Sequence, residues 1–428
     1  MNNQLLEELA WRGMLLDKTE GVDSLFAQEG PVTAYIGFDP TADSLHVGSL
    51  LPIMGLVHFQ RCGHKPIALV GGATGMIGDP SGKSKERNLL TPDILAHNVA
   101  CIHAQLEKFL DFETEKNPAR LVNNADWIGP MSFIEFMRDV GKHFSVGAML
   151  AKESVKRRVS EAGISFTEFG YMILQSHDFY HLNKEFDCTL QMGGSDQWGN
   201  ITAGADLIRR RSDGTRKAHG IVFPLVKSAS GTKFGKTEDG AVWLDANRTS
   251  PYRFYQFWLN TPDADALGYL KAFTTLSREE VDALAEAQEA APHKREVQHK
   301  LAGDITSRVH GEQALQAAIQ ASRAMFGGDL DELSGSEVGD IFNEVPSTEI
   351  ARSSFEGEGC PILQLFTDCG VTKSNGEARR LCQGNGMNLN NRRITDVKRN
   401  VVLDDAIEGK YLVLRKGGKT YHLVKLRD

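Results

Sequence analysis

Hydrophobic residues follow one pattern over the first 249 positions of the chain and another after them. Short apolar runs at 32–38 and 65–72 predict buried strands, and the stretch between them, 47–63, has the three-and-four spacing of a helix. A strand, a helix and a second strand at this spacing predict parallel strands joined by a helical crossover. We therefore expect an α/β fold with a doubly wound parallel sheet. Further strands are expected at 119–127, 188–194 and 220–226.

The later part of the chain changes character twice. Residues 250–326 keep helical spacing, which predicts an α-helical domain. Residues 327–360 are rich in Gly, Ser and acidic residues, and we expect them to form a poorly packed linker. Residues 361–428 end in two alternating runs around a Gly-Gly turn, which predicts a small α+β module. The α/β domain is expected to take up residues 1–249.

Polar residues follow the predicted strands of the α/β domain. Because the carboxyl ends of parallel strands share one edge of a sheet, the loops after these strands are expected to meet in one cleft. These loops are 39–46, 79–87, 123–127 and 195–200. In the first of them, Thr41 and His46 precede a helix, whose free amides favour phosphate oxygens. A surface capping turn is the alternative reading of that loop.

A helix is predicted over 165–182, and Tyr171, Gln175 and Asp178 lie on one face of it. A phenol, an amide and a carboxylate between apolar neighbours suit a cleft that binds a small polar ligand, because buried polar groups need partners. A stripe exposed to water is the alternative. Gly193 and Gly194, followed by Asp196, suit contact with a planar ring and a ribose, or else a tight turn with a helix cap.

Two short loops resemble phosphate-binding loops but are each one residue too short. They are "GDPSGKS" (78–84) and "GTKFGKT" (231–237), and both have three residues between the glycines where the P-loop has four. Neither is therefore predicted to wrap a phosphate in the P-loop manner.

Charge is distributed unevenly along the chain. The formal net charge is −8, yet residues 361–428 hold 13 Lys and Arg against 7 Asp and Glu, which leaves −14 for residues 1–360. A basic module on an acidic body suits a protein that binds RNA locally. The six cysteines show no zinc or disulfide spacing, and no apolar run reaches 18 residues, so a protein of the cytoplasm is expected, without a protein-bound metal or prosthetic group.

Five stretches together resemble the bacterial tyrosyl-tRNA synthetases, which are class I aminoacyl-tRNA synthetases. These stretches are "GFDPTADSLHVGSL", "GGATGMIGDP", "GISFTEFGYMILQSHDF", "GGSDQWGNI" and "GTKFGKTEDGAVWLD", and the terminal "SNGEARRLCQGNGMNLNNRRI" resembles a small RNA-binding domain. The resemblance implies a Rossmann-like catalytic domain, a helical anticodon-arm domain and a C-terminal RNA-binding domain. It also implies a homodimer that joins L-tyrosine to ATP, with Mg²⁺, and then transfers the tyrosyl group to the 3′ end of tRNA(Tyr).

The resemblance assigns a role to individual residues. Catalysis at the phosphates is implied for Thr41, His46, Lys83, Arg87, Lys233 and Lys236. Tyrosine binding is implied for Tyr35, Asp39, Asp79, Tyr171, Gln175, Asp178, Gln191 and Gln197. ATP binding is implied for Gly37, His46, Gly48, Ser49, Gly193, Asp196 and Lys236. The basic patches expected to meet tRNA are the C-terminal module and Lys152, Arg157, Arg209 and Arg210.

One residue departs from the family pattern. The first signature of the family is His-x-Gly-His, and here a serine, Ser49, stands at the second histidine. Three alternatives stay open: a tryptophanyl enzyme, an RNA-binding protein that has lost catalysis, and a simpler nucleotidyltransferase. The pair Tyr35 and Asp178, which suits a phenol, disfavours the first of these.

Overall fold

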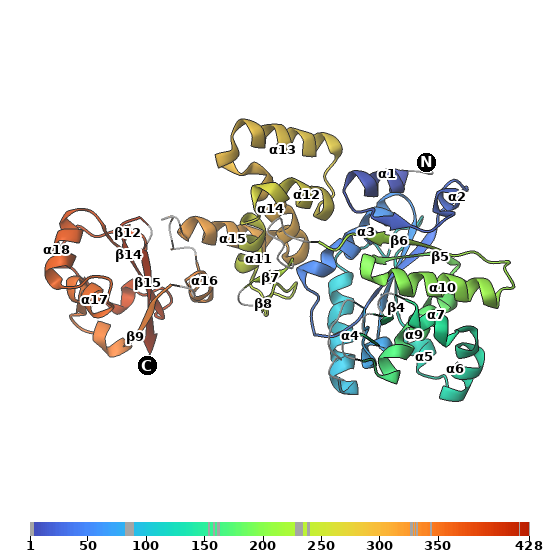
Figure 1. Cartoon of the computed structure of the whole chain (residues 1–428). Coiled ribbons are helices and arrows are strands. Elements are labelled where there is room, and N and C mark those ends of the chain that lie inside the picture. Colours follow the sequence, from blue (N-terminus) through green and yellow to red (C-terminus); the bar gives the residue numbers. More distant parts are fainter. Residues whose placement is uncertain are drawn as a thin grey trace. The chain divides into compact units, whose positions relative to one another are not determined.

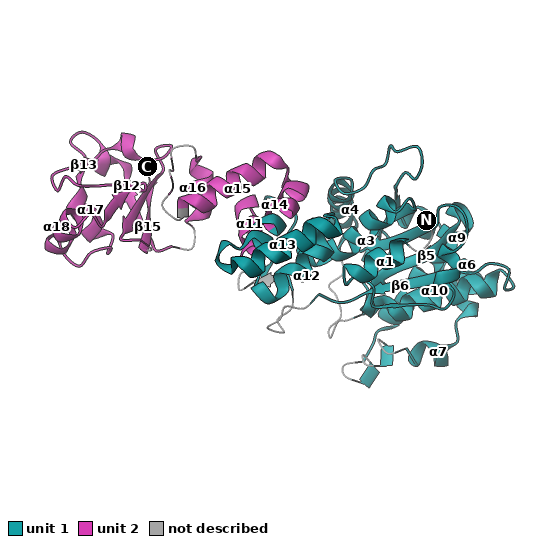
Figure 2. Cartoon of the chain, turned by 90° about the horizontal axis from the view of Figure 1, so that it is seen from above, with its two compact units in different colours: residues 1–248, 261–301 teal, residues 249–260, 302–428 magenta. Residues whose placement is uncertain are grey.

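The computed structural model describes residues 4–81, 90–152, 155–156, 159–160, 163–226, 234–237, 240–325, 328, 330, 333–342, 345–418 and 420–427. The chain forms two compact units, and neither is continuous in sequence (Figure 2). The first contains residues 1–248 and 261–301, and the second contains residues 249–260 and 302–428. The expected helical domain, 250–326, is thus shared between the two units, while the functional division into three domains stays a prediction.

The first unit is built on a six-stranded sheet of the order β1-β6-β5-β2-β3-β4 (Figure 1). All neighbouring strands are parallel except β1, which is antiparallel to β6. The predicted parallel α/β sheet is therefore confirmed. Its strands are β1 (Asp17–Lys18), β2 (Thr33–Phe38), β3 (Lys65–Val70), β4 (Arg120–Asn123), β5 (Cys188–Gly194) and β6 (His219–Phe223).

One predicted strand is shorter than expected. The segment 119–127 was expected to be a single strand, but β4 stops at Asn123 and the short helix α5 (Ala125–Ile128) follows at once. The Asn123 side chain accepts a hydrogen bond from the backbone N–H of Ala125 at 3.0 Å. This turn, which asparagine favours, redirects the chain out of the sheet.

Helices cover both faces of the sheet. On one face, Tyr35, Ile67 and Leu69 pack with residues of α9 (Phe166–Phe186) and α10 (Trp198–Arg211). A Cβ on Gly220 of β6 would meet Ile201 of α10, whereas Phe223 of the same strand lies against Gly55 of α3 (Leu50–Arg61). Because side chains alternate along a strand, α3 covers the face opposite to α10.

The first unit contains further helices and one short hairpin. They are α1 (Gln4–Trp11), α2 (Val22–Phe26), η1 (Val47–Ser49), η2 (Thr74–Met76), α4 (Pro92–Leu106), α6 (Phe133–Asp139), η3 (Gly141–His143), α7 (Val146–Leu150), η4 (Ser195–Gln197), α12 (Asp263–Phe273), α13 (Arg278–Ala290), η5 (Pro292–Lys294), and the hairpin of β7 (Lys236–Thr237) and β8 (Gly240–Ala241). The helix α14 (Glu296–His310) begins in the first unit and ends in the second.

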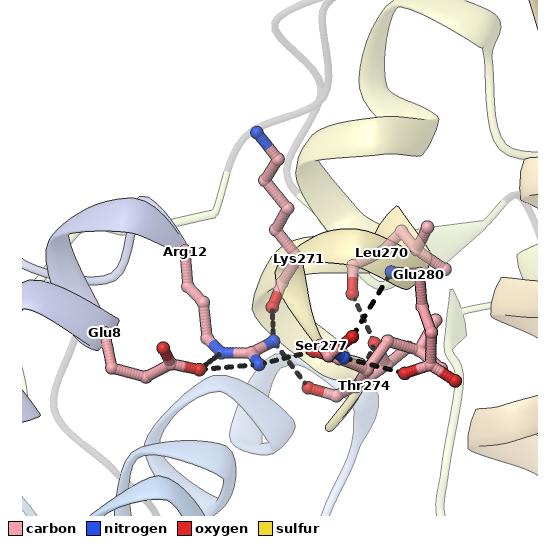
Figure 3. A network of polar contacts seen from close by, with 8 residues as sticks. Glu8, Arg12, Leu270, Lys271, Thr274, Ser277 and Glu280 are labelled. Atoms are coloured by element: carbon pink, nitrogen blue, oxygen red, sulfur yellow. Dashed lines mark hydrogen bonds and ion pairs between the residues drawn. The ribbon is translucent and has the colours of Figure 1, made fainter. Parts of the chain in front are cut away.

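A buried arginine joins the N-terminal helix to the segment after α12 (Figure 3). The Arg12 side chain is 1% exposed and pairs with Glu8 at 2.7 Å. Its guanidinium also donates to the backbone carbonyls of Lys271, Thr274 and Leu276 at 2.7, 2.9 and 2.8 Å. These carbonyls lie at the C-terminal end of a helix, where a cation is favourable, so α1 and α12 are held together by a fully partnered charge.

The second unit combines helices with a five-stranded sheet of the order β12-β11-β14-β15-β9. Its elements are α11 (Pro251–Leu259), α15 (Glu312–Met325), α16 (Gly335–Ile341), β9 (Ser347–Ala351), η6 (Arg352–Phe355), β10 (Cys360–Pro361), α17 (Ile362–Asp368), α18 (Asn375–Gln383), β11 (Met387–Leu389), β12 (Arg392–Arg393), β13 (Asn400–Val401), η7 (Leu403–Asp405), β14 (Tyr411–Lys416) and β15 (Thr420–Arg427). The expected α+β module is present in this unit.

The expected linker, 327–360, is packed over much of its described part, so that expectation was wrong. Val338, Ile341 and Phe342 are buried against the sheet residues Val413 and Leu423. The strand β9 pairs in parallel with β15, which makes it part of the C-terminal sheet. The composition of the segment was misleading because a few apolar residues at helical spacing are enough to anchor it.

Candidate active site

Asp39, directly after β2, organises the edge of the sheet where the parallel strands end. One of its carboxylate oxygens accepts a hydrogen bond from the hydroxyl of Thr74 at 3.0 Å, and the other accepts one from the hydroxyl of Tyr171 at 2.9 Å. A Cβ on Gly71 would lie 2.4 Å from both Asp39 Oδ1 and Thr74 Oγ1. Only glycine leaves room for this approach, so β2, β3 and α9 meet at one carboxylate.

Asp178, on α9, is a buried carboxylate held by two donors. Asn124 Nδ2 donates to Oδ2 at 2.9 Å, and Trp127 Nε1 donates to Oδ1 at 2.8 Å. The ring of His181 stacks on Trp127, with ring centroids 4.3 Å apart. Burial raises the pKa of Asp178 to about 7, although both hydrogen bonds favour the charged form. The loop 123–127 therefore contacts the polar face of α9 through Asn124 and Trp127.

Two buried polar groups on β2 and β5 have no hydrogen-bond partner among the described residues. They are the hydroxyl of Tyr35, whose side chain is almost fully buried, and the Oε1 atom of Gln191. These residues face each other in the register of β2 and β5. Burial, and next the charge of Asp178, raise the pKa of Tyr35 well above its ordinary value, so its hydroxyl stays protonated. Buried polar groups are normally satisfied, so this pair is suited to a polar group of a ligand.

Side-chain amides link the loop after β3 to α9 and to the loop after β5. Gln197 Nε2 donates to Asp79 Oδ2 at 2.6 Å, and Gln175 Nε2 donates to Gln197 Oε1 at 3.1 Å. Asn200 donates to Gln175 at 3.0 Å and so completes the link. Burial, then the carboxylates of Asp39 and Asp79, raise the pKa of Tyr171 well above its ordinary value. Two carboxylates around one neutral phenol make this end of the site attractive to an ammonium group.

Two of the residues expected at the phosphates, Thr41 and His46, lie on the segment 41–49. Thr41 and His46 are exposed, and His46 Nδ1 accepts a hydrogen bond from the backbone N–H of Gly48 at 3.0 Å. Ser49 is the N-cap of α3, but its side chain makes no capping hydrogen bond. The exposed His46 ring and the start of α3 are therefore compatible with an anionic ligand.

The hairpin β7–β8 is joined to the same segment through the backbone. Val242 N–H donates to the carbonyl of Gly235 at 3.0 Å, and Val47 N–H donates to the carbonyl of Val242 at 2.9 Å. The backbone of Lys236 thus begins β7 close to the first signature. Lys83, Arg87, Arg157 and Lys233 lie outside the described residues, as does the side chain of Lys236.

The remaining nucleotide candidates lie at strand ends. Gly37 is exposed near the end of β2, and Gly193 and Gly194 end β5. Asp196 follows in η4 and is only partly exposed, and a Cβ on Gly194 would lie 2.5 Å from its carboxylate. The paired glycines therefore leave the Asp196 carboxylate next to bare backbone, which suits a ribose or a tight turn equally well.

The basic residues expected to meet tRNA surround an acidic one. Arg209 and Arg210 pair with Asp206 at 2.5 and 2.8 Å. Lys152 donates to the hydroxyl of Thr202 at 3.0 Å, and burial lowers its pKa while Asp206 opposes that shift. Part of this positive charge is thus compensated within the protein.

Sequence reasoning did not single out Asn124, Trp127 and Asn200 as individual site residues. All three lie in loops that were expected to join the cleft, directly after β4 and β5. Their position after a parallel strand is the signal that identifies them. Which of these residues turn inward depends on the tertiary arrangement, and periodicity carries no information about it.

Comparison with known proteins identifies the family of this chain. Residues 27–327 match the family model of the tRNA synthetases class I (W and Y), and residues 337–424 match that of the tyrosine–tRNA ligase SYY-like C-terminal domain. A tyrosine–tRNA ligase of Roseiflexus castenholzii is 53% identical over 423 residues, which cover 99% of each chain. Another, of Bacillus caldotenax, is 50% identical over 98% of this chain and 99% of its own.

A solved structure is also similar to this chain. The C-terminally truncated mitochondrial tyrosyl-tRNA synthetase of Aspergillus nidulans is similar with a TM-score of 0.68 and 33% identity, over 75% of this chain and 94% of that one. The protein is a class I aminoacyl-tRNA synthetase. Within this class, the chain belongs to the tyrosine–tRNA ligase family, as its full-length similarity to several bacterial members shows.

The raised pKa of Asp178 makes stability depend on pH. Because the folded protein holds this proton more tightly than the unfolded chain, its contribution is complete below about pH 4 and is lost as the pH rises through about 7. The free energy of unfolding of the wild type, minus that of Asp178→Asn, should fall by about 4 kcal/mol at most between pH 4 and 8. Urea unfolding of both proteins measures this difference.

Asp126→Asn is the matched control, because it removes an exposed carboxylate from the neighbouring loop. A difference between the wild type and Asp178→Asn that does not change with pH would contradict the assignment of a buried, late-titrating carboxyl.

Proposed function

We propose that this protein activates L-tyrosine with ATP, releasing pyrophosphate, and then transfers the tyrosyl group to the 3′ end of tRNA(Tyr). One observation carries the proposal: the buried Tyr35 hydroxyl has no hydrogen-bond partner among the described residues and interacts electrostatically with the Asp178 carboxylate, which is held by two donors. A hydroxyl and a carboxylate together accept and donate to a phenol. Phenylalanine would leave the Tyr35 hydroxyl without a ligand partner and would donate nothing to Asp178, an effect for which tyrosyl enzymes are the familiar example.

The other polar groups are assigned to the remaining parts of the substrates. The ammonium of tyrosine is proposed to bind among Asp79, Tyr171 and Gln175, with Asp39, Gln191 and Gln197 as supporting contacts. The carboxylate of tyrosine is already a nucleophile, so its attack on the α-phosphate of ATP needs no general base. What helps is positioning and cationic stabilisation of the departing pyrophosphate. Thr41, His46, Lys83, Arg87, Lys233 and Lys236 are proposed for this task.

ATP is proposed to bind as its magnesium complex, with its ribose and ring near Gly37, Gly48, Ser49, Gly193 and Asp196. Among the described residues no group of three or more His, Cys, Asp or Glu side chains is placed to hold a metal ion. Magnesium is proposed to enter with the nucleotide as part of the substrate.

Pyrophosphate exchange tests the proposal. The protein, ATP and labelled pyrophosphate should give exchange into ATP with tyrosine and not with phenylalanine or tryptophan. Exchange with tryptophan would favour the tryptophanyl alternative. No exchange with any amino acid would favour an RNA-binding protein without catalysis.

The two lysines of the KFGKT stretch should act in the transition state. We expect Lys233→Ala and Lys236→Ala to lower kcat for exchange by about 100-fold or more while ATP affinity changes by less than about tenfold. Ser49→His should stay within about tenfold of the wild type, because the Ser49 side chain makes no capping hydrogen bond that the change would remove. Pre-steady-state kinetics measures the rate and the ATP affinity of each variant separately. Equal losses of rate and of ATP affinity in the lysine variants would contradict this assignment.

Binding of tRNA is proposed to involve the C-terminal module together with Lys152, Arg157, Arg209 and Arg210. Four exposed arginines of the module lie on α18 and β12. A variant with Arg379, Arg380, Arg392 and Arg393 changed to Gln should bind tRNA about tenfold or more weakly, with a flatter salt dependence, while exchange is kept. Filter binding at several salt concentrations measures this.

A matched variant removes four exposed lysines elsewhere. It carries Gln at Lys108, Lys116, Lys184 and Lys300. If both variants lose the same affinity, general charge rather than the module binds tRNA.

A homodimer is proposed on the basis of exposed apolar side chains. Phe133, Ile134 and Met137 of α6 are 64%, 71% and 41% exposed, and Phe166 at the start of α9 is 71% exposed. Such residues in a group mark a protein interface. Ile134→Asp should convert the dimer to a monomer in light scattering, whereas Ile94→Asp, which changes an exposed isoleucine of α4, should not. A monomeric wild type would disprove the proposal.

A cytoplasmic location is proposed with the synthetase function. Within the part of the chain that the structure describes, no helix is long and apolar enough to cross a membrane.

A further inference from the structure

The aromatic residue of the KFGKT stretch packs against a helix instead of facing the site. The ring of Phe234 stacks on that of Phe273, with centroids 5.5 Å apart and planes 9° from parallel. It also meets the ring of Tyr269 edge-on at 5.1 Å. Both partners belong to α12, and Phe273 is only 2% exposed. Phe234 is therefore anchored on a rigid, buried platform.

The next residue, Gly235, is held from another direction. Its backbone has φ +76°, and a Cβ there would lie 2.6 Å from Val47 Cγ2. Its carbonyl accepts the hydrogen bond from Val242, which in turn binds Val47. Two consecutive residues thus fix the chain, one on α12 and one on the His46 signature, immediately before Lys236.

Packing between helices connects α12 to the His46 signature. The helix α12 packs on α3, which follows the signature directly. The Arg12 guanidinium binds three carbonyls at and just beyond the end of α12, as Figure 3 shows. A displacement of Phe234 from α12 therefore changes where β7 begins relative to His46.

We propose that Phe234 is a positioning residue, whose aromatic contact with Tyr269 and Phe273 sets the backbone of Lys236 beside the His46 signature. It acts through Lys236 and does not touch the substrate. The proposal rests on the synthetase function proposed above. Since the tyrosine pocket is built by β2, β5 and α9, loss of the contact should slow adenylate formation and leave tyrosine binding unchanged.

The test compares Phe234→Ala with Phe234→Tyr in the full chain. Phe234→Ala should lower kcat for tyrosine-dependent pyrophosphate exchange by about tenfold, while the equilibrium affinity for tyrosine stays within about twofold. Phe234→Tyr keeps the ring and should restore the rate to within about twofold. Phe109→Ala, which removes a partly buried phenylalanine of the same unit, is the matched control and should have no effect on kcat.

A double-mutant cycle ties the effect to the contact. Tyr269→Leu should slow exchange less than Phe234→Ala does, and the double variant should be no slower than Phe234→Ala, because the contact is already lost. Additive losses would overturn the proposal, as would a Phe234→Ala protein with the wild-type rate or with a parallel loss of tyrosine affinity. A wild type without tyrosine-dependent exchange would contradict the synthetase function itself, which is a different result.

Discussion

Parallel pairing of the strands β5, β2, β3 and β4 is the constraint on which the site depends. Because the strands are parallel, every one of them ends at the same edge, and the polar residues that follow them converge. Asp39, Asp79, Asn124 and Gln197 come from four different loops and are linked through α9. A shift of β2 by a single residue would turn Tyr35 to the opposite face of the sheet, and the same shift of β5 would turn Gln191 there.

The site uses burial in two different ways. At Asp178, burial opposes the charge, and two donors restore part of what desolvation takes away. At Tyr35, burial keeps the hydroxyl neutral, and no described residue makes a hydrogen bond to it. The pair is therefore prepared for a ligand hydroxyl that completes both sets of hydrogen bonds. Such preparation is costly in the empty protein, and this cost is the physical basis for rejecting a ligand without the hydroxyl.

The segments proposed to bind the phosphates, residues 41–49 and the hairpin of β7 and β8, are held by contacts outside the parallel sheet. The hairpin of β7 and β8 reaches the site through backbone hydrogen bonds to residues 45–47 and through an aromatic contact with α12. The buried Arg12 makes α12 part of the same unit as the sheet, although the two are far apart in sequence. The first unit is thus assembled from two separate parts of the chain.

Much of the fold and of the site followed from the sequence. Periodicity predicted β2, β3, β5 and β6 to within a few residues, and helical spacing placed Tyr171, Gln175 and Asp178 on one face. The packing of residues 327–360 was not predicted, because composition does not show whether Val338 and Phe342 have a surface to bury against. The end of β4 was misjudged because the turn depends on one side-chain hydrogen bond from Asn123.

The sequence by itself determined the class of the sheet, the order of its loops and the family, since these depend on local spacing and on motifs in series. Only the tertiary structure decided that Asn124 and Trp127 hold Asp178, that no described residue bonds the Tyr35 hydroxyl or Gln191 Oε1, and that Phe234 packs on α12. These facts arise from contacts between residues distant in the chain, and no local pattern encodes the distance between them.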